Sequence, residues 1–105
     1  MPSIEQLQKL LALDESDTFV LYALAQELSK AGDHAGAVAY YDRCLAVDDA
    51  YCYAYFHKAR SLEALGDMDA ARETLAAGLD VARRVGDSKA TNEIGGYLDE
   101  LRLRS

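Results

Sequence analysis

The residue types that carry most protein chemistry are scarce in this sequence. Its two histidines, His34 and His57, have no second ligand at the spacing of a metal site. Its two cysteines, Cys44 and Cys52, do not form a Cys-x-x-Cys pair. Neither a Gly-x-Ser-x-Gly nucleophile motif nor a phosphate-binding loop occurs. The sequence therefore predicts that the protein is not an enzyme and needs neither a metal nor a cofactor.

These residues are better explained as parts of the fold. His34 follows a Gly-Asp pair and is interpreted as a solvated turn residue. Cys44 falls on a small, buried position of its predicted helix, which indicates a structural thiol. Cys52 opens the next helix, where a structural role is favoured over a reactive one. Neighbouring acidic residues fit turn and helix-cap positions rather than paired catalytic carboxylates: Asp48, Asp49, Asp67 and Asp69.

Composition limits the partners and the location. The chain has 105 residues, of which 18 are acidic and 11 basic, so its net charge is −7. Binding of nucleic acid or an anionic membrane depends on clustered Lys and Arg, so neither partner is expected. The acidic balance is interpreted as a contribution to solubility, with attraction of a basic partner as the alternative. The two cysteines, the lack of a leading signal segment and of an apolar run of about 20 residues predict a cytoplasmic protein.

A 34-residue repeat organises the chain. Its first copy joins two helical stripes through a Gly-Asp turn: Leu21, Leu24, Ala25, Leu28, Gly32, Asp33, Ala37 and Tyr41. Most of the pattern returns at a constant offset of 34 residues: Tyr55, Ala59, Leu62, Gly66, Asp67, Ala71 and Leu75. A fixed period of this size indicates an array of stacked helical units.

The same periodicity predicts about six helices and no strands. A capping box of Ser3 and Gln6 opens a first helix that ends near Leu13. Later helices are expected over residues 18–31, 34–47, 51–65, 68–85 and 88–103. Close backbone packing is expected to explain Gly95-Gly96 inside the last helix. The predicted organisation is one domain, 1–105, with a half repeat (3–15), two full repeats (18–51 and 52–87) and a half repeat or capping helix (88–104).

This pattern resembles the tetratricopeptide repeat (TPR) family, whose unit is a helix-turn-helix of 34 residues. Besides the two full units, Thr91, Ile94-Gly95 and Leu98 match the first half of a third unit. The resemblance implies an all-α solenoid of antiparallel helix-turn-helix repeats. Three departures from the family pattern stand out. Lys58 replaces an apolar residue, so we expect its stem to pack while its ammonium reaches water. Asp49 and Arg83 replace the closing Pro, and the step to the third unit is about two residues longer, which leaves the orientation of the last helix open.

In this family, the first helices of the units line a concave surface suited to a peptide. The resemblance implies these groove-facing residues: Phe19, Tyr22, Gln26, Ser29 and Lys30; Tyr53, Phe56, His57 and Arg60; and Lys89, Asn92 and Glu93. The four aromatic members lie off the packed stripe, which favours a binding groove over packing between units. Lys30, His57 and Arg60 are expected to orient a peptide by holding a carboxylate. Tyr22 and Gln26 stand where some members clamp the C-terminal carboxylate of chaperone peptides with Lys and Asn, so that ligand is not expected.

Two functions remain open from the sequence. The favoured one is a protein–protein interaction adaptor that binds a peptide or helix of a protein partner in the groove. The alternative is a self-association or assembly module that pairs through its terminal helices: Ile4, Leu7 and Leu11 at one end, and Ile94, Leu98, Leu101 and Leu103 at the other. Polar residues on the last helix favour the adaptor and a monomer, with weak self-association as the alternative: Asp99, Glu100, Arg102 and Arg104.

Overall fold

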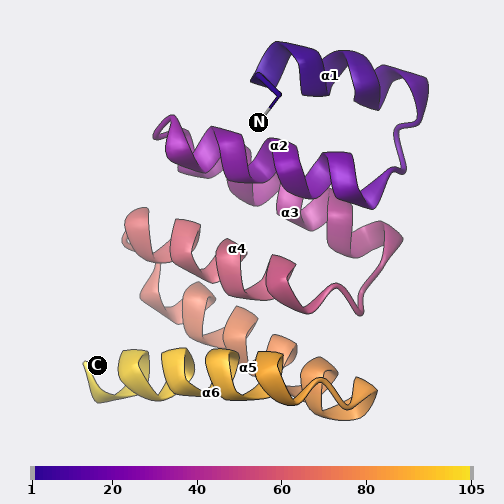
Figure 1. The fold of residues 1–105 in the computed structure, drawn as a ribbon. Helices are drawn as coiled ribbons and strands as arrows, with labels where there is room; N and C mark the ends of the chain where they lie inside the picture. Colours follow the sequence, from indigo (N-terminus) through magenta and orange to yellow (C-terminus); the bar gives the residue numbers. More distant parts are fainter. Residues whose placement is uncertain (1, 105) are drawn as a thin grey trace.

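Six α-helices are stacked in chain order in the computed structural model, which describes residues 2–104 (Figure 1). They are α1 (Ile4–Leu13), α2 (Thr18–Lys30), α3 (His34–Val47), α4 (Cys52–Ala64), α5 (Met68–Val85) and α6 (Ser88–Leu103). Every bound lies within one residue of its sequence prediction, and the described residues contain no strand. The prediction of an all-α solenoid with six helices is confirmed.

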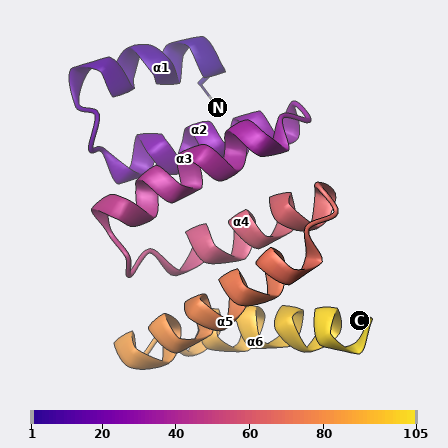
Figure 2. The same cartoon turned by 180° about the vertical axis from the view of Figure 1, so that it is seen from behind.

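The helices alternate between two layers. In Figure 1, α2, α4 and α6 lie on the near side, and Figure 2 shows α3 and α5 in front when the molecule is seen from behind. Most packing joins helices that are neighbours in the chain, but α2 also contacts α4, and α4 contacts α6. The first helices of successive units therefore share one continuous face of the molecule.

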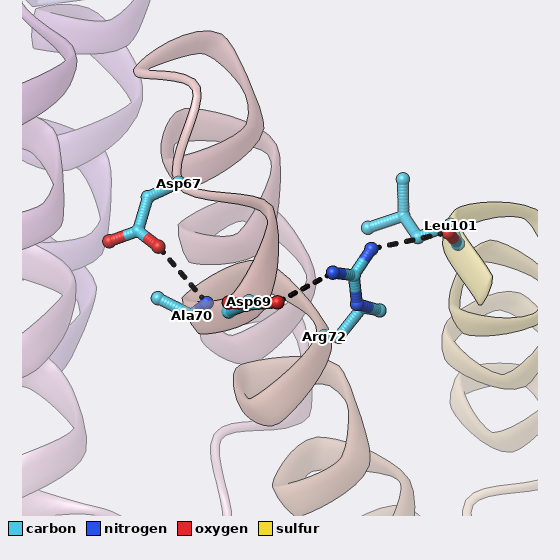
Figure 3. A network of polar contacts seen from close by, with 5 residues as sticks. All are labelled: Asp67, Asp69, Ala70, Arg72 and Leu101. Carbon is cyan, nitrogen blue, oxygen red and sulfur yellow. Dashed lines mark hydrogen bonds and ion pairs between the residues drawn. The ribbon is translucent and has the colours of Figure 1, made fainter. Parts of the chain in front are cut away.

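The turns between helices are specified by glycine and aspartate. Three glycines that end helices or follow them have positive φ angles, where glycine is least strained: Gly32 (+88°), Gly66 (+82°) and Gly86 (+75°). The aspartate after each of them caps the next helix. Asp67, for example, accepts a hydrogen bond from the backbone N–H of Ala70 at 3.2 Å (Figure 3). The capping box of Ser3 and Gln6 also forms as predicted.

The core pairs small residues with large ones. Alanines of α2 to α5 are fully buried and let adjacent helices approach closely: Ala25, Ala37, Ala59 and Ala71. Tyr41 and Leu75, at equivalent positions of the two full units, are among the largest buried side chains. The buried residues form one cluster centred on α1 to α3 and another on α4 to α6. The repeat residues therefore build the stack, as the sequence pattern indicated.

The close backbone approach expected at Gly95-Gly96 is not there, so that prediction is wrong. A Cβ added to Gly95 would meet only Leu79, at an ordinary 3.6 Å, and one added to Gly96 would meet nothing within 4 Å. The close approach lies at Gly78 of α5, where an added Cβ would be 2.5 Å from the Cβ of Tyr55 in α4. The tight approach is therefore between the two helices of one unit, whereas Gly96 borders a cavity between α4 and α6.

The last helix is held by polar contacts to both α4 and α5. Arg72 of α5 donates a hydrogen bond to the backbone carbonyl of Leu101, at 3.4 Å (Figure 3). On the α4 side, the Glu63 carboxylate accepts hydrogen bonds from Tyr97 and from Arg104. These bonds, together with the buried apolar face of α6, determine the orientation that the sequence left open.

The sequence suggested that the ammonium of Lys58 reaches water, but in the structure it forms an ion pair. Its Nζ lies 2.6 Å from Oδ1 of Asp42 in α3, and its side chain is only 23% exposed. The polar substitution at an apolar position is therefore accommodated by an ion pair between the two full units. Because Asp42 is more than half exposed, a pair of this kind contributes about 0–1 kcal/mol.

Candidate functional site

Two cavities open between the first helices of successive units. The α2–α4 cavity has a volume of about 430 Å³ and is lined by Gln26, Ser29, Lys30, His34, Tyr41, His57, Arg60 and Ala64. The α4–α6 cavity has a volume of about 540 Å³ and is lined by Phe56, Arg60, Glu63, Asn92, Glu93, Gly96, Tyr97 and Glu100. Arg60 lines both cavities, which places α4 and this side chain at their shared wall.

A row of aromatic rings connects the two cavities. The aromatic row contains, in order, Tyr51, Tyr22, His57, Phe56 and Tyr97, with Tyr41 behind its middle. The His57 ring centre lies 5.8 Å from that of Tyr22 and 5.2 Å from that of Phe56. His57 also stacks on Tyr41 at 6.5 Å with an angle of 18° between the rings. Side chains from α2, α4 and α6 thus form one continuous aromatic surface.

Burial disfavours the charged forms of the titratable rings in this row. It raises the pKa of Tyr22 to about 12 and raises the pKa of Tyr41 as well. For His57, burial and then the nearby cation of Arg60 lower the pKa of the imidazole below its usual value. The neutral rings offer an apolar surface, and Arg60 supplies a fixed positive charge beside it.

The structure brings together most of the residues that the sequence placed in a groove. Gln26, Ser29, Lys30, His57 and Arg60 line the α2–α4 cavity, and Phe56, Asn92 and Glu93 line the α4–α6 cavity. Tyr22 joins them through its ring contact with His57. Their use in binding stays a prediction.

Besides Tyr22, three predicted groove residues line neither of these two cavities. Phe19, at the start of α2, is 70% exposed. Tyr53 packs against the core of α4 to α6. Lys89 is exposed in the first turn of α6. Helical spacing from the cavity-lining residues explains this outcome, because all three lie nearer the N-terminal end of their helix than the cavities do.

Several site residues were missed from the sequence. Gly96 and Glu100 follow Arg60 and Ala64 by 36 residues, the same longer step that relates the second unit to the third, so the repeat alone could have identified them. Tyr97 could not be found in this way, because the residue at the equivalent place in the second unit is buried rather than in the groove. In the structure its ring lies against Phe56 and its hydroxyl donates to Glu63, both on α4, which places Tyr97 at the α4–α6 cavity.

His34 and the cysteines are explained by local packing. His34 is half-buried in the first turn of α3, at the α2–α4 cavity and 3.5 Å from Ser29 Oγ, so it is not the solvated turn residue expected. Cys44 is buried as predicted and its thiol donates to the carbonyl of Thr18 at 3.7 Å. Burial raises the pKa of Cys44 to about 11 and also raises that of Cys52, which makes both thiols poor nucleophiles.

The apolar end surfaces expected for self-association are mostly inside the core, which corrects that prediction. Leu7, Leu11, Ile94, Leu98 and Leu101 are buried, and Ile4 is half-buried. They complete the core because α1 packs on α2, and α6 packs on α5 and α4. Only Leu103 is exposed as expected, at 87%. Other exposed leucines lie on the outer side of α1: Leu10 and Leu13.

Neither a metal cluster nor a membrane span occurs in the described part of the chain. Residues 2–104 contain no group of three or more His, Cys, Asp or Glu side chains that could hold a metal ion. No helix among them is both long enough and apolar enough to cross a membrane.

Known proteins share this pattern and this fold. A family model described as tetratricopeptide repeat matches residues 28–89. A TPR repeat-containing protein of Pseudomonas aeruginosa is 30% identical over 98 residues, which covers 93% of each chain. The structure of PcrH in complex with the chaperone binding region of PopD has a TM-score of 0.90 at 22% identity and covers 96% of this chain and 77% of that one. The TPR2B domain of yeast Sti1, in a complex with pHsp70, has a TM-score of 0.89 at 20% identity and covers 97% and 82%. At this identity the two structures establish a common fold.

Proposed function

Because the chain belongs to the tetratricopeptide repeat family, we propose that it is an adaptor that binds a segment of a partner protein along the face of α2, α4 and α6. Two proteins of the same fold have been solved in complexes: PcrH with the chaperone binding region of PopD, and the TPR2B domain of Sti1 with pHsp70. The adaptor acts by binding, as a cytoplasmic monomer, without catalysis or a cofactor.

The observation that carries this proposal is the aromatic row that joins the two cavities. Tyr22 and Phe56 are only half-buried, although both are large apolar rings on a face that no other helix of residues 2–104 covers. Rings held in place by neighbouring rings lose little side-chain entropy when a ligand covers them, which suits them as binding anchors. A helix or an extended segment laid across α4 would contact both rings and reach both cavities.

The test is loss of peptide binding when these two rings are removed. Peptides would be selected from a phage-displayed random library on the wild-type protein, and their affinities measured by fluorescence anisotropy. If two anchors of about 2 kcal/mol each contribute additively, Tyr22→Ala with Phe56→Ala should weaken binding by about 1,000-fold. Phe19→Ala is the matched control, because Phe19 is an exposed aromatic residue of the same helix that lies outside the aromatic row. Unchanged affinity in a double variant with wild-type helicity would contradict the proposal.

Self-association remains a second candidate, supported by the outer side of α1. Leu13 is 84% exposed beside Leu10, and both border an open depression with Pro2 and Lys9. Sedimentation velocity would detect a dimer that forms through this surface and that Leu13→Glu disrupts. A monomer over the full concentration range would exclude it.

A further inference from the structure

The two cavities of the groove differ in charge. Among the residues that line the α2–α4 cavity there is no carboxylate, whereas its basic or imidazole side chains are Lys30, His34, His57 and Arg60. The α4–α6 cavity shares Arg60 as its one cation and contains three carboxylates, those of Glu63, Glu93 and Glu100. One side of Arg60 is therefore cationic and the other side acidic.

Some of these charges are already neutralised within the protein. The Glu63 carboxylate accepts hydrogen bonds from Tyr97 and from Arg104. The hydrogen bond from Arg104 is the main reason why the pKa of Glu63 lies below its usual value. Lys30 lies 3.1 Å from Glu27 but keeps 64% of its side chain exposed. Glu63 therefore links α4 to α6, and Glu27 pairs with Lys30 within α2, so neither carboxylate adds to the open charge of the groove.

Other charges of the groove are open to a ligand. Arg60 is exposed and forms none of the salt bridges found among the described residues. Glu93 and Glu100 are exposed on α6, on either side of Gly96, which has no side chain to fill the space between them. The Glu93 carboxylate accepts a hydrogen bond from Tyr53, which leaves its negative charge in place. The open groups are thus cationic at one cavity and anionic at the other.

We propose that the bound segment is bipolar, with an internal acidic side chain in the α2–α4 cavity and a basic side chain in the α4–α6 cavity. Lys30 and Arg60 hold the acidic side chain by charge-assisted hydrogen bonds, and Glu93 and Glu100 hold the basic one. An apolar side chain between them covers Phe56 and His57 on the aromatic row. This inference rests on the proposed peptide-binding function and specifies the chemistry of its ligand.

The net charge of the whole chain favours a basic ligand, whereas the α2–α4 cavity favours an acidic side chain. With a net charge of −7, the protein attracts basic segments at long range. An acidic side chain has to be recognised locally, and the α2–α4 cavity provides cations without competing carboxylates. The opposite placement would set like charges against each other at both cavities, which disfavours the reversed orientation of the segment. The pair of cavities therefore specifies both the composition and the direction of the bound segment.

The experiment is a charge-swap analysis on peptides selected from a random library. The peptides are displayed with their C-termini fused to the coat protein, so a free terminal carboxylate cannot supply the acidic group. Wild-type selection should enrich one Asp or Glu and one Lys or Arg at a constant spacing. Lys30→Glu and Glu100→Lys should each weaken binding by at least about tenfold. Changing the peptide's acidic residue to Lys should restore binding to Lys30→Glu, and changing its basic residue to Glu should restore binding to Glu100→Lys.

A charge reversal away from the groove provides the control. Glu73 is exposed on α5, on the opposite layer, and Glu73→Lys should leave the affinities unchanged. Enriched peptides that depend on Tyr22 and Phe56 but carry no charge pattern, or swaps that do not restore binding, would overturn the bipolar ligand alone. A selection that enriches no peptide at all would overturn the proposed function together with it.

Discussion

Replacing Gly78 by alanine tests the tight packing between α4 and α5. The new Cβ would lie 2.5 Å from the Cβ of Tyr55 and 2.9 Å from its Cγ. Rotating the Tyr55 side chain cannot relieve this contact, because Cβ is bonded directly to the backbone of α4. The Tyr55 hydroxyl is also held by a 2.7 Å hydrogen bond to the carbonyl of Asp49. The two helices must therefore move apart, and overpacking of this kind costs about 1–3 kcal/mol.

Gly96 provides a matched control for the backbone effect of the substitution. Both glycines lie inside helices, so both gain about 1 kcal/mol from the better helix propensity of alanine. At Gly96 the new methyl group meets nothing within 4 Å, so this gain should appear as increased stability. The propensity gain cancels in the difference between the two variants. Gly78→Ala should therefore be less stable than Gly96→Ala by about 1–3 kcal/mol.

Thermal unfolding followed by circular dichroism measures this difference directly. For a domain of this size, 1 kcal/mol corresponds to about 4–8 °C, so the midpoint of Gly96→Ala should lie at least about 4 °C above that of Gly78→Ala. Equal midpoints would refute the close contact between α4 and α5. Gly96→Ala should also weaken binding of selected peptides, because its methyl group enters the α4–α6 cavity.

Three further measurements address the core and its titratable groups. Ala37→Leu and Ala71→Leu should each lower stability by about 1–3 kcal/mol, because both alanines are fully buried, and unchanged melting midpoints would contradict the assigned faces. Because the pKa of His57 is lowered in the folded protein, the unfolded chain binds its proton first as the pH falls below about 6.5, so stability should decrease from there through the folded-state pKa. The slope of melting midpoint against pH should be shallower in His57→Gln, and an identical slope would show that His57 is not responsible. Cys44 should resist iodoacetamide at mildly alkaline pH in the native protein and react in urea, as read from the intact mass, because burial raises its pKa to about 11.

The elements of the fold could be predicted from the sequence because their signals are local. The Gly-Asp pairs end one helix and cap the next within a few residues, so the start of α3 and both bounds of α5 follow without knowledge of their neighbours. The constant offset between repeats then identifies which residues share a packed face. Both kinds of signal act over short stretches or repeat along the chain, and neither depends on the angle at which two units meet.

The details of the site depend on that angle and could not be predicted. Helical spacing places Phe19 and Tyr22 on the same side of α2, yet only Tyr22 meets the rings of α4. Likewise, the pair of Lys58 with Asp42 joins residues on successive helices of different units. No local pattern distinguishes Gly78, which contacts Tyr55, from the glycines of α6. The relative placement of the units decides each of these cases.

The position of α4 in the stack explains why the candidate site centres on it. Among the described residues, α4 is the one first helix with another first helix on each side, so its groove-facing residues border two cavities. The end helices α2 and α6 each contribute to one cavity, and their charges can differ without conflict. Arg60 then serves both cavities, and His57 and Phe56 connect the rings of α2 to those of α6. Two full units and a final helix are therefore sufficient to build a groove with distinct ends, since direction comes from the difference between α2 and α6.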